Sequence, residues 1–474
     1  QRLQARFGSE VTVYHSKFSV HERTEVWNNI LDKNPNAKII VGTRSAIFLP
    51  FNQLGLVIVD EEHELSYKQF DPSPRYHARD SAVVLAGMYQ AKVVLGSATP
   101  ALESSFNRLS GKYGWVQLGE RYGKVAMPEI LTIDLKSAYK KKKMKGGFSH
   151  TLIHEMEQTL SMGKQIILFQ NQRGYAPVME CLDCGHMPQC HQCDVTLTYH
   201  QYSDQLKCHY CGYQIAVPEQ CHACGLHNLS TKGMGTQQIQ EQVSTLFPEV
   251  SVARMDWDTT RGKWAFDKLI HSFAAQEVKI LVGTQMIIKG LDFQNVHLVG
   301  VLNADHLMNF PDFRAHERTY QMLSQVAGRA GRKALRGKVL IQTYQPQHPI
   351  IQKVIEGNYD QMLHQQLKDR KEYHYPPYNR LIRMVVNHSD METVKKASQW
   401  IVNVLLQSDY GQILGPVFPL IARVRNRYRM QILIKIEGSQ SRDRVKQIIR
   451  KTLDRFESIA IFRSCKVNLD VDPY

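Results

Sequence analysis

The chain has 474 residues, of which 43% are hydrophobic, enough to bury the cores of about three domains. Lys and Arg number 59 against 44 Asp and Glu, and the resulting net charge of +15 suits a polyanionic partner. The length, the clustered cysteines and the lack of a signal peptide or a membrane-length apolar run argue against a secreted disulfide scaffold and a membrane protein. We therefore expect a protein of the reducing cytoplasm.

The first predicted domain, residues 1–125, is an α/β lobe. Apolar runs of strand length at 38–48, 54–63 and 91–100 alternate with helical patterns and end in polar residues. Such runs are typical of buried parallel strands, which carry their chemistry at the carboxyl ends.

The D-E-E-H sequence that follows the second run is the first candidate site. Asp60 and Glu61 come directly after the strand, where nucleotide phosphates bind in such sheets. In triphosphate hydrolysis the first carboxylate would hold magnesium and the second would orient the attacking water. The alternative is a simple helix cap. The small-residue turn 96–100 suits coupling of nucleotide state to lobe motion.

A second α/β lobe is predicted for residues 126–350. Between the strand-like runs of the first lobe and those of the second, the run 139–143 (Tyr-Lys-Lys-Lys-Lys) is interpreted as a solvated loop rather than a nucleic-acid contact. Two such sheets in one chain predict a cleft between lobes. The strand-like runs of the second lobe are 165–174, 250–256, 278–287, 296–305 and 337–345.

An insertion at 178–230 interrupts the second lobe and carries eight of the nine cysteines as four C-x-x-C pairs. Tetrahedral-ligand spacing favours two structural zinc sites over disulfides or an iron–sulfur cluster. Fourteen residues separate the second pair from the third, as in a zinc ribbon, but only five separate the first from the second. We therefore expect one zinc on the inner pairs, Cys190, Cys193, Cys208 and Cys211, and one on the outer pairs, Cys181, Cys184, Cys221 and Cys224.

Four cysteines fill each expected zinc shell and leave no open position for catalysis. Second-shell or solvated roles are therefore expected for His186, His191, His209 and His222. The ninth cysteine, Cys465, is interpreted as a core residue of an apolar terminal strand.

The Q-V-A-G-R-A-G-R sequence at 325–332 supplies Arg329 and Arg332, which are three residues apart and are expected to be neighbours on a helix. Their guanidinium groups could reach a γ-phosphate across the cleft; the alternative is a ladder of surface ion pairs. With the D-E-E-H sequence, this block gives the candidate catalytic residues Asp60, Glu61, His63, Gln325, Arg329 and Arg332.

The third predicted domain, residues 351–474, reads β-α-β-β-α-β, which is a ferredoxin-like α+β order. The expected strands are 380–388, one or two strands within 420–436, and 465–471, with helices at 391–407 and 443–456. If Arg423, Arg425, Arg427 and Arg429 occupied one strand, they would share a face. That face could meet phosphates or an acidic peptide, or be a solvated edge.

These motifs in this order resemble the PriA family, bacterial primosomal DNA helicases of superfamily 2, from about Val11 to the C-terminus. The resemblance implies two RecA-like lobes with nested zinc pairs in the second. It implies magnesium and ATP in the intact protein, with Gly290 and Asp292 of the coupling motif as cofactor-binding residues. It further implies DNA contacts in a strand-contacting motif, the coupling motif and an aromatic-rich loop, from Thr43, Arg44, Tyr67, Phe70, Arg75, Tyr76 and Thr284.

The resemblance also implies the function: 3′-to-5′ unwinding of DNA and primosome assembly at stalled forks. Its partners would be forked and single-stranded DNA, the tail of the single-strand binding protein and other primosome proteins. We expect a monomeric, nucleoid-associated protein without membrane contact. Two alternatives are a zinc-stabilised scaffold without motor activity and an RNA helicase, which would not carry this insertion.

One departure from the family concerns the phosphate-binding loop. The sequence contains no G-x-x-x-x-G-K-[ST], and it opens on Gln1. We therefore expect a C-terminal fragment with a truncated first lobe and part of an ATP site, which does not turn over ATP by itself.

Overall fold

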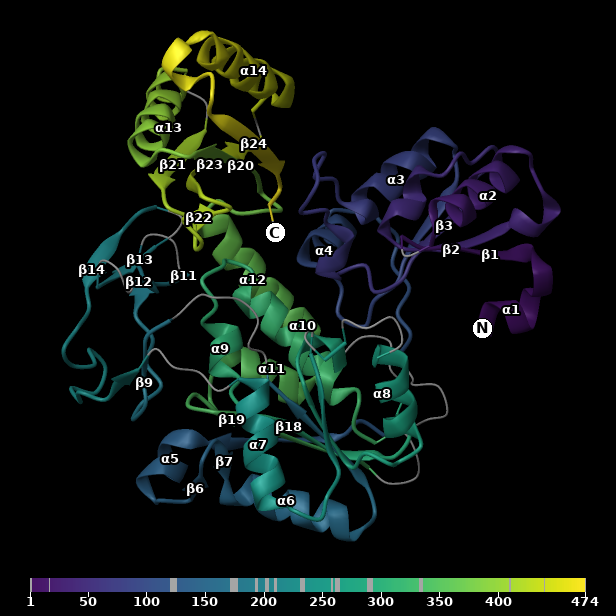
Figure 1. Ribbon diagram of the computed structural model, residues 1–474, viewed down its shortest axis with the longest axis vertical. Coiled ribbons are helices and arrows are strands. Elements are labelled where there is room, and N and C mark those ends of the chain that lie inside the picture. Colours follow the sequence, from purple (N-terminus) through teal and green to yellow (C-terminus); the bar gives the residue numbers. More distant parts are fainter. Residues whose placement is uncertain are drawn as a thin grey trace. The chain divides into compact units, whose positions relative to one another are not determined.

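A computed structural model describes residues 2–16, 18–119, 126–170, 178–191, 195–200, 204–208, 211–230, 235–256, 259–260, 265–287, 293–331, 336–408, 411–438 and 440–473. The chain folds as two compact units, residues 1–105 and 106–473 (Figure 1). Among the described residues, no helix combines the length and the apolar character needed to cross a membrane.

Unit 1 is built from two pairs of parallel strands. β1 (Val11–Tyr14) pairs with β2 (Ile39–Gly42), and β3 (Leu56–Val59) pairs with β4 (Lys92–Leu95). The predicted run 38–48 is a strand only as far as Gly42, because the chain then folds back as the 3-10 helix η3 (Arg44–Phe48). A Cβ atom on Gly42 would overlap the Cβ of Ala46, so a glycine is required at this reversal.

The central sheet of unit 2 is parallel throughout, with the strand order β16-β17-β8-β18-β19-β5. Alternate residues of its strands pack on α6 (His150–Ser161) and α7 (Thr236–Leu246) in one apolar core. The predicted second α/β lobe is confirmed. The strands are β5 (Glu129–Asp134), β8 (Gln165–Phe169), β16 (Val252–Met255), β17 (Ile280–Gly283), β18 (Val296–Val301) and β19 (Lys338–Thr343).

The insertion between β8 and α7 is a module of short antiparallel strands with its own small core. Its first and last strands pair with each other, so the module leaves the lobe and returns to it at one place. The strands are β9 (Glu180–Cys181), β10 (Gln189–Cys190), β11 (Val195–Thr196), β12 (Thr198–His200), β13 (Gln205–Lys207), β14 (Gln214–Ala216) and β15 (Leu229–Ser230).

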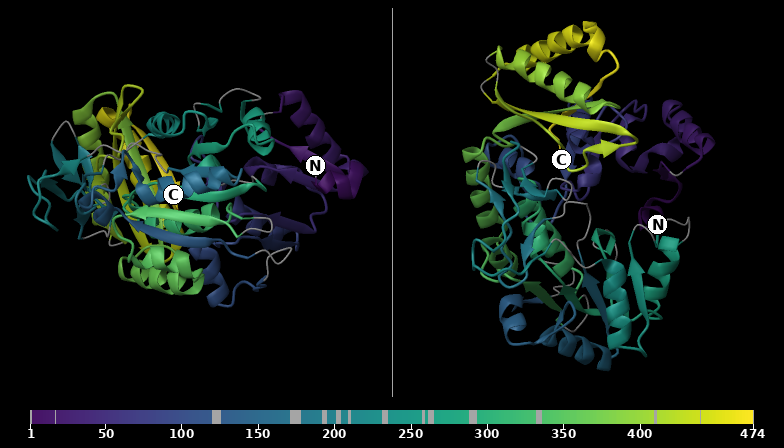
Figure 2. Two further views of the ribbon diagram at one scale, coloured as in Figure 1. Left: turned by 90° about the horizontal axis from the view of Figure 1, so that it is seen from below. Right: turned by 60° about the vertical axis from the view of Figure 1, so that its left-hand side comes forward.

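The C-terminal part confirms the ferredoxin-like order. Its antiparallel sheet has the order β21-β23-β20-β24, and α13 (Met391–Leu406) and α14 (Arg442–Ser458) pack on one face of it (Figures 1 and 2). The strands are β20 (Asn379–His388), β21 (Gln412–Val417), β22 (Arg423–Val424), β23 (Arg427–Glu437) and β24 (Lys466–Val471).

Two details of that domain differ from the prediction. The second strand is β21, which the sequence pattern did not indicate because the strand is short and contains Gly415 and Pro416. The arginines do not share one strand: Arg425 and Asn426, both with positive φ, form the turn of the β22–β23 hairpin. Cys465 lies just before β24, half-buried against the core.

Further helices and short strands complete the two units. The lysines at 140–143 are exposed around the end of α5. These elements are α1 (Arg2–Phe7), α2 (Val20–Leu31), α3 (Ala78–Met88), α4 (Leu102–Leu109), α5 (Leu135–Lys140), β6 (Met144–Lys145), β7 (Phe148–Ser149), α8 (Ala265–Ala274), α9 (Asp305–Met308), α10 (Ala315–Ala327), α11 (Pro349–Glu356) and α12 (Tyr359–Glu372).

Candidate functional site

The D-E-E-H turn at the carboxyl end of β3 presents two carboxylates to solvent and buries the two side chains that follow. Asp60 is exposed, and the Glu61 side chain is 48% exposed. Glu62 and His63 are only 1% and 7% exposed. Asp60 and Glu61 are therefore accessible to a ligand, whereas Glu62 and His63 are packed inside unit 1.

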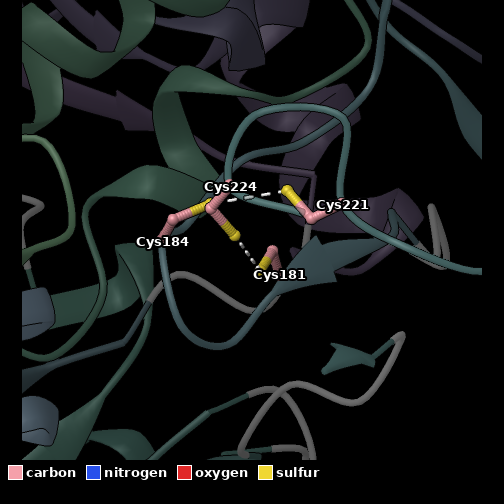
Figure 3. Close-up of side chains that lie close together, drawn as sticks. All are labelled: Cys181, Cys184, Cys221 and Cys224. Atoms are coloured by element: carbon pink, nitrogen blue, oxygen red, sulfur yellow. Dashed lines mark hydrogen bonds between the residues drawn. The ribbon is translucent and has the colours of Figure 1, made fainter. Parts of the chain in front are cut away.

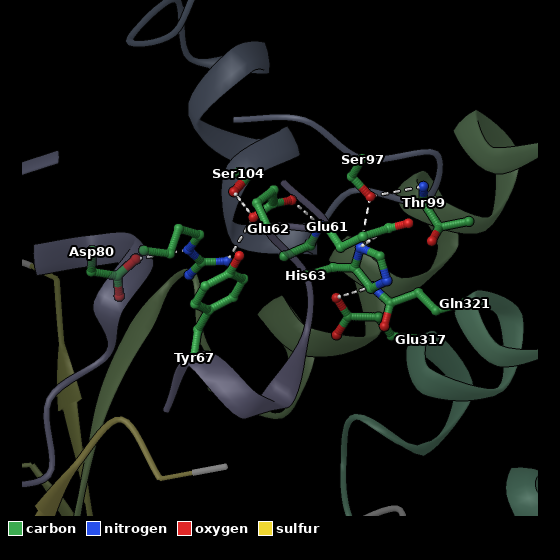
Figure 4. A network of polar contacts seen from close by, with 12 residues as sticks. Glu61, Glu62, His63, Tyr67, Asp80, Ser97, Thr99, Ser104, Glu317 and Gln321 are labelled. Carbon is green, nitrogen blue, oxygen red and sulfur yellow. Dashed lines mark hydrogen bonds and ion pairs between the residues drawn. The ribbon is translucent and has the colours of Figure 1, made fainter. Parts of the chain in front are cut away.

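Glu62 joins three elements of unit 1 (Figure 4). Its carboxylate accepts hydrogen bonds from the Ala101 N–H at 2.6 Å and from the Ser104 hydroxyl at 2.8 Å. It also pairs with the guanidinium of Arg79 on α3 at 3.0 Å, and both side chains are buried. The turn is thereby fixed both to α3 and to the segment that leads into α4.

His63 connects the turn to the loop after β4. Its Nδ1 lies 2.7 Å from the Ser97 hydroxyl oxygen, and that oxygen also accepts the Thr99 N–H at 2.9 Å (Figure 4). The Glu61 carboxylate lies 3.7 Å from the same Nδ1. A movement of the 96–100 loop would therefore also shift the His63 side chain of the D-E-E-H turn.

The expected aromatic-rich loop is closed at its base. The Lys68 side chain is 2% exposed and donates to the Arg75 carbonyl at 2.9 Å, and Gln69 N–H donates to the Tyr76 carbonyl at 2.8 Å. Tyr76 packs edge-on against Phe48. These contacts fix the two ends of the loop to each other and to η3.

The expected DNA-contacting residues of unit 1 occupy different surroundings. Thr43 is exposed and Phe70 is 48% exposed, whereas Arg75 is half-buried. The Arg44 guanidinium donates to the Lys68 carbonyl at 2.9 Å. The Tyr67 hydroxyl donates to the Asp60 carbonyl at 2.6 Å. Burial, and then the charges of Asp60 and Glu64, raise the pKa of Tyr67 and keep this hydroxyl a donor.

The candidate residues of unit 2 are only partly described. Gln325 lies on α10, but this helix ends at Ala327, so Arg329 lies in the following turn and the prediction that it lies on a helix is wrong. Gly328 follows the last residue of α10, and Gly331, two residues after Arg329, has a left-handed φ of 66°. Thr284 is 5% exposed. Arg332, Gly290 and Asp292 lie outside the described residues, and convergence of Asp60, Glu61, Arg329 and Arg332 stays a prediction.

The four outer cysteines of the module lie together, as Figure 3 shows. The sulfur atoms of Cys181, Cys184, Cys221 and Cys224 are all within 4.8 Å of one another. The sulfurs of Cys181 and Cys224 are 3.7 Å apart, and those of Cys184 and Cys221 are 3.5 Å apart. These distances exceed a disulfide bond of about 2.05 Å and approach the edge of about 3.8 Å expected for a tetrahedral zinc–thiolate site with bonds of about 2.3 Å.

The inner cysteines form a second group. The sulfurs of Cys190, Cys208 and Cys211 lie within 4.8 Å of one another, and Cys193 is outside the described residues. The His191 ring packs edge-on against Tyr213. Within the described part of the chain, neither cysteine group includes a histidine.

Three of the cysteine pairs share one backbone arrangement that the spacing argument overlooked. Each pair is followed at once by a glycine with positive φ, Gly185, Gly212 or Gly225. The N–H of that glycine donates to the carbonyl of the first cysteine at 2.7 to 3.1 Å. The signal C-x-x-C-G is visible in the sequence at these three pairs, because only glycine takes this conformation readily.

The electrostatics of the outer group fit a bound cation. Burial raises the pKa of the Cys181 and Cys184 thiols. At Cys221 burial acts in the same direction, but hydrogen bonds from the Ala223 and Cys224 N–H groups outweigh it and lower the pKa. A divalent cation would offset the cost of holding four thiolates together.

A partly buried contact between a histidine and a carboxylate fixes the module to the lobe. Glu180, next to the first cysteine, lies 2.9 Å from Nε2 of His306 on α9. Burial opposes the charged imidazole, but the Glu180 carboxylate prevails and raises the pKa of His306. No sequence pattern indicated this contact between residues far apart in the chain.

Two parts of the chain match family models of helicases. Residues 1–106 match the family model for the DEAD/DEAH box helicase, and residues 231–334 match the helicase conserved C-terminal domain. Residues 190–215 match the PriA DNA helicase Cys-rich region, and residues 371–474 match the primosomal protein N C-terminal domain.

The chain belongs to the PriA family. It is 40% identical over its whole length to the replication restart protein PriA of Bacillus subtilis, and it spans 58% of that relative. It is 38% identical to PriA of Treponema pallidum, again over its whole length, and spans 70% of that relative. Among solved structures it is similar to RecG bound to a three-way DNA junction, with a TM-score of 0.37 and 12% identity over 77% of this chain and 40% of that one.

Replacing Glu62 by Ala should destabilise unit 1 strongly. The change removes the buried carboxylate that pairs with the Arg79 guanidinium, and breaking a buried ion pair by removing one partner costs about 3–5 kcal/mol. Hydrogen exchange of the α3 amides measures this effect as a lower opening free energy.

The matched control is Asp80→Ala, which removes an exposed carboxylate that pairs with the Arg79 guanidinium at 2.8 Å. Because the Asp80 side chain is 58% exposed, its removal should cost at most about 1 kcal/mol. Equal effects of the two changes would contradict the anchoring role of Glu62.

Proposed function

We propose that this chain is part of an ATP-dependent DNA helicase that acts in replication restart. The observation that carries the proposal is the pair of exposed carboxylates, Asp60 and Glu61, at the carboxyl end of a parallel strand. Membership of the PriA family supports it, because the relatives are named replication restart proteins.

In this proposal the exposed carboxylates take different roles in ATP hydrolysis. Asp60 would hold Mg²⁺, which neutralises charge on the phosphates, and Glu61 would orient the attacking water. Gln325, Arg329 and Arg332 would contact the γ-phosphate, and Gly290 and Asp292 would contribute to the nucleotide site. The sequence has no G-x-x-x-x-G-K-[ST], so the chain alone should lack the amides and lysine that hold the β- and γ-phosphates.

The chain spans about three fifths of the first relatives it matches. The activity of the whole protein is therefore also a proposal, supported by the same relatives. We propose 3′-to-5′ unwinding at forks, with the tail of the single-strand binding protein and primosome proteins as partners. We place this activity on nucleoid DNA in the cytoplasm.

For the cysteine module we propose two structural zinc ions. The outer group offers four sulfurs at suitable separations, and Cys193 would complete the inner group of Cys190, Cys208 and Cys211. Four protein ligands leave no position for a reacting water, so these ions would stabilise the fold and take no part in catalysis.

Replacing Glu61 by Gln in the full-length protein should lower DNA-stimulated ATP turnover by about 10²–10⁴-fold, the usual contribution of a general base. Nucleotide binding should remain, because the amide keeps the shape of the side chain. Steady-state turnover and nucleotide titration measure the two effects.

The control for this change is Glu10→Gln, which alters an exposed carboxylate of unit 1 paired with Lys38. It should leave turnover unchanged. Wild-type turnover in the Glu61 variant would refute the assignment and favour a scaffold without motor activity.

Elemental analysis of the reduced chain, purified without chelators, should find two zinc ions per molecule. Cys221→Ser should remove the outer ion, because three thiolates bind zinc less tightly than four. Cys465→Ser should keep both, since this cysteine lies outside the two groups. Fewer than two ions in the wild-type chain would contradict the proposal.

DNA binding by the chain should weaken steeply with salt, because a chain with a net charge of +15 displaces counterions from phosphates. Replacing both Arg425 and Arg427 by Ser should reduce the logarithmic salt slope by about one for each phosphate that the hairpin no longer neutralises. Binding isotherms measured over a series of salt concentrations give this slope.

A control for the hairpin change is Lys446→Ser, which removes an exposed cation from α14. It should leave the slope unchanged. Binding that does not depend on salt would refute the electrostatic account.

A further inference from the structure

The Tyr67 hydroxyl is directed back toward the strand that carries the exposed carboxylates. It donates to the Asp60 carbonyl oxygen at 2.6 Å. That carbonyl belongs to the peptide group that joins Asp60 to Glu61. The hydroxyl therefore holds the peptide plane from which the Glu61 residue begins.

The conformation of Glu61 makes this peptide plane important. Glu61 has a φ of 48°, in the left-handed region that favours glycine and is rare for a glutamate. Such a conformation persists only where the surroundings fix it. On the other side of Glu61, its carbonyl accepts the Glu64 N–H at 2.8 Å, and the Glu62 N–H donates to the Gly96 carbonyl at 3.0 Å.

Tyr67 is itself held in place. It ends the 3-10 helix η4 (Leu65–Tyr67), and its N–H donates to the Glu64 carbonyl at 3.1 Å. The next residue, Lys68, is buried and fixed to the Arg75 carbonyl. The base of the loop is therefore rigid enough to keep the hydroxyl on the Asp60 carbonyl.

We propose that Tyr67 is a positioning residue for Glu61, which acts through the hydrogen bond to the Asp60 carbonyl. The inference rests on the proposed function, in which Glu61 orients the attacking water. In this role Tyr67 acts through the backbone of the turn and not on the reacting atoms themselves. Its hydroxyl keeps the backbone of Glu61 in the strained conformation, and so keeps the carboxylate aimed at one place.

The test is Tyr67→Phe in the full-length protein, because this change removes the hydroxyl and keeps the ring. With saturating DNA, kcat for ATP should fall roughly tenfold, while KM for ATP and the Kd for single-stranded DNA stay at their wild-type values. A selective fall in kcat separates positioning from binding.

The matched control is Tyr89→Phe. The Tyr89 hydroxyl donates to the Phe51 carbonyl at 2.5 Å, so this change removes the same kind of bond in unit 1, away from the D-E-E-H turn. It should leave kcat at the wild-type value. Hydrogen exchange of α3 should show both variants folded to the same extent.

Three results would overturn the inference. A wild-type kcat in Tyr67→Phe, alongside loss of turnover in Glu61→Gln, would exclude positioning by the hydroxyl while leaving the proposed function intact. Weaker DNA binding with a wild-type kcat at saturating DNA would assign Tyr67 to DNA contact. Wild-type turnover in Glu61→Gln would refute the proposed function, and the inference with it.

Discussion

The buried pair of Glu62 and Arg79 is the interaction on which the candidate site of unit 1 depends. It fixes the end of β3 to α3, and the same carboxylate holds the Ala101 N–H and the Ser104 hydroxyl. Because an unpaired charge at this depth is costly, the turn cannot shift without breaking several contacts together. Asp60 and Glu61 can remain exposed and still be well placed, since Glu62, which follows them, is held both by α3 and by residues 101–104.

The cysteine module also has to hold side chains in fixed positions, but it does so with glycine turns and grouped cysteines in place of a buried ion pair. Its strands are short and its core is small, so packing alone gives it little stability. Left-handed glycines shape three of the cysteine pairs, and the sulfurs then converge in two groups. The Glu180–His306 pair joins the outer group to α9, so the module is fixed to the lobe beside its first cysteine.

The sequence predicted the parts of the fold that depend on local pattern. Buried strands such as β8 and β18 were predicted from largely apolar runs of strand length. The helices α13 and α14 were predicted from the helical spacing of their apolar residues. β21 was missed because Gly415 and Pro416 weaken its pattern, and its place in the sheet comes from pairing with β23. Arg329 was wrongly expected on a helix because its spacing from Arg332 suits one, whereas α10 ends at Ala327.

For the site, the sequence predicted that paired carboxylates follow a strand. It also predicted, from the spacing of the cysteine pairs, how the cysteines group. Which carboxylates are exposed depends on packing, since the burial of Glu62 requires Arg79, 17 residues further along. Packing also sets the direction of the Tyr67 hydroxyl and the pairing of Glu180 with His306. The physical reason is that spacing along a chain reports local geometry, whereas a hydrogen bond between distant residues exists only once the elements that carry them have packed.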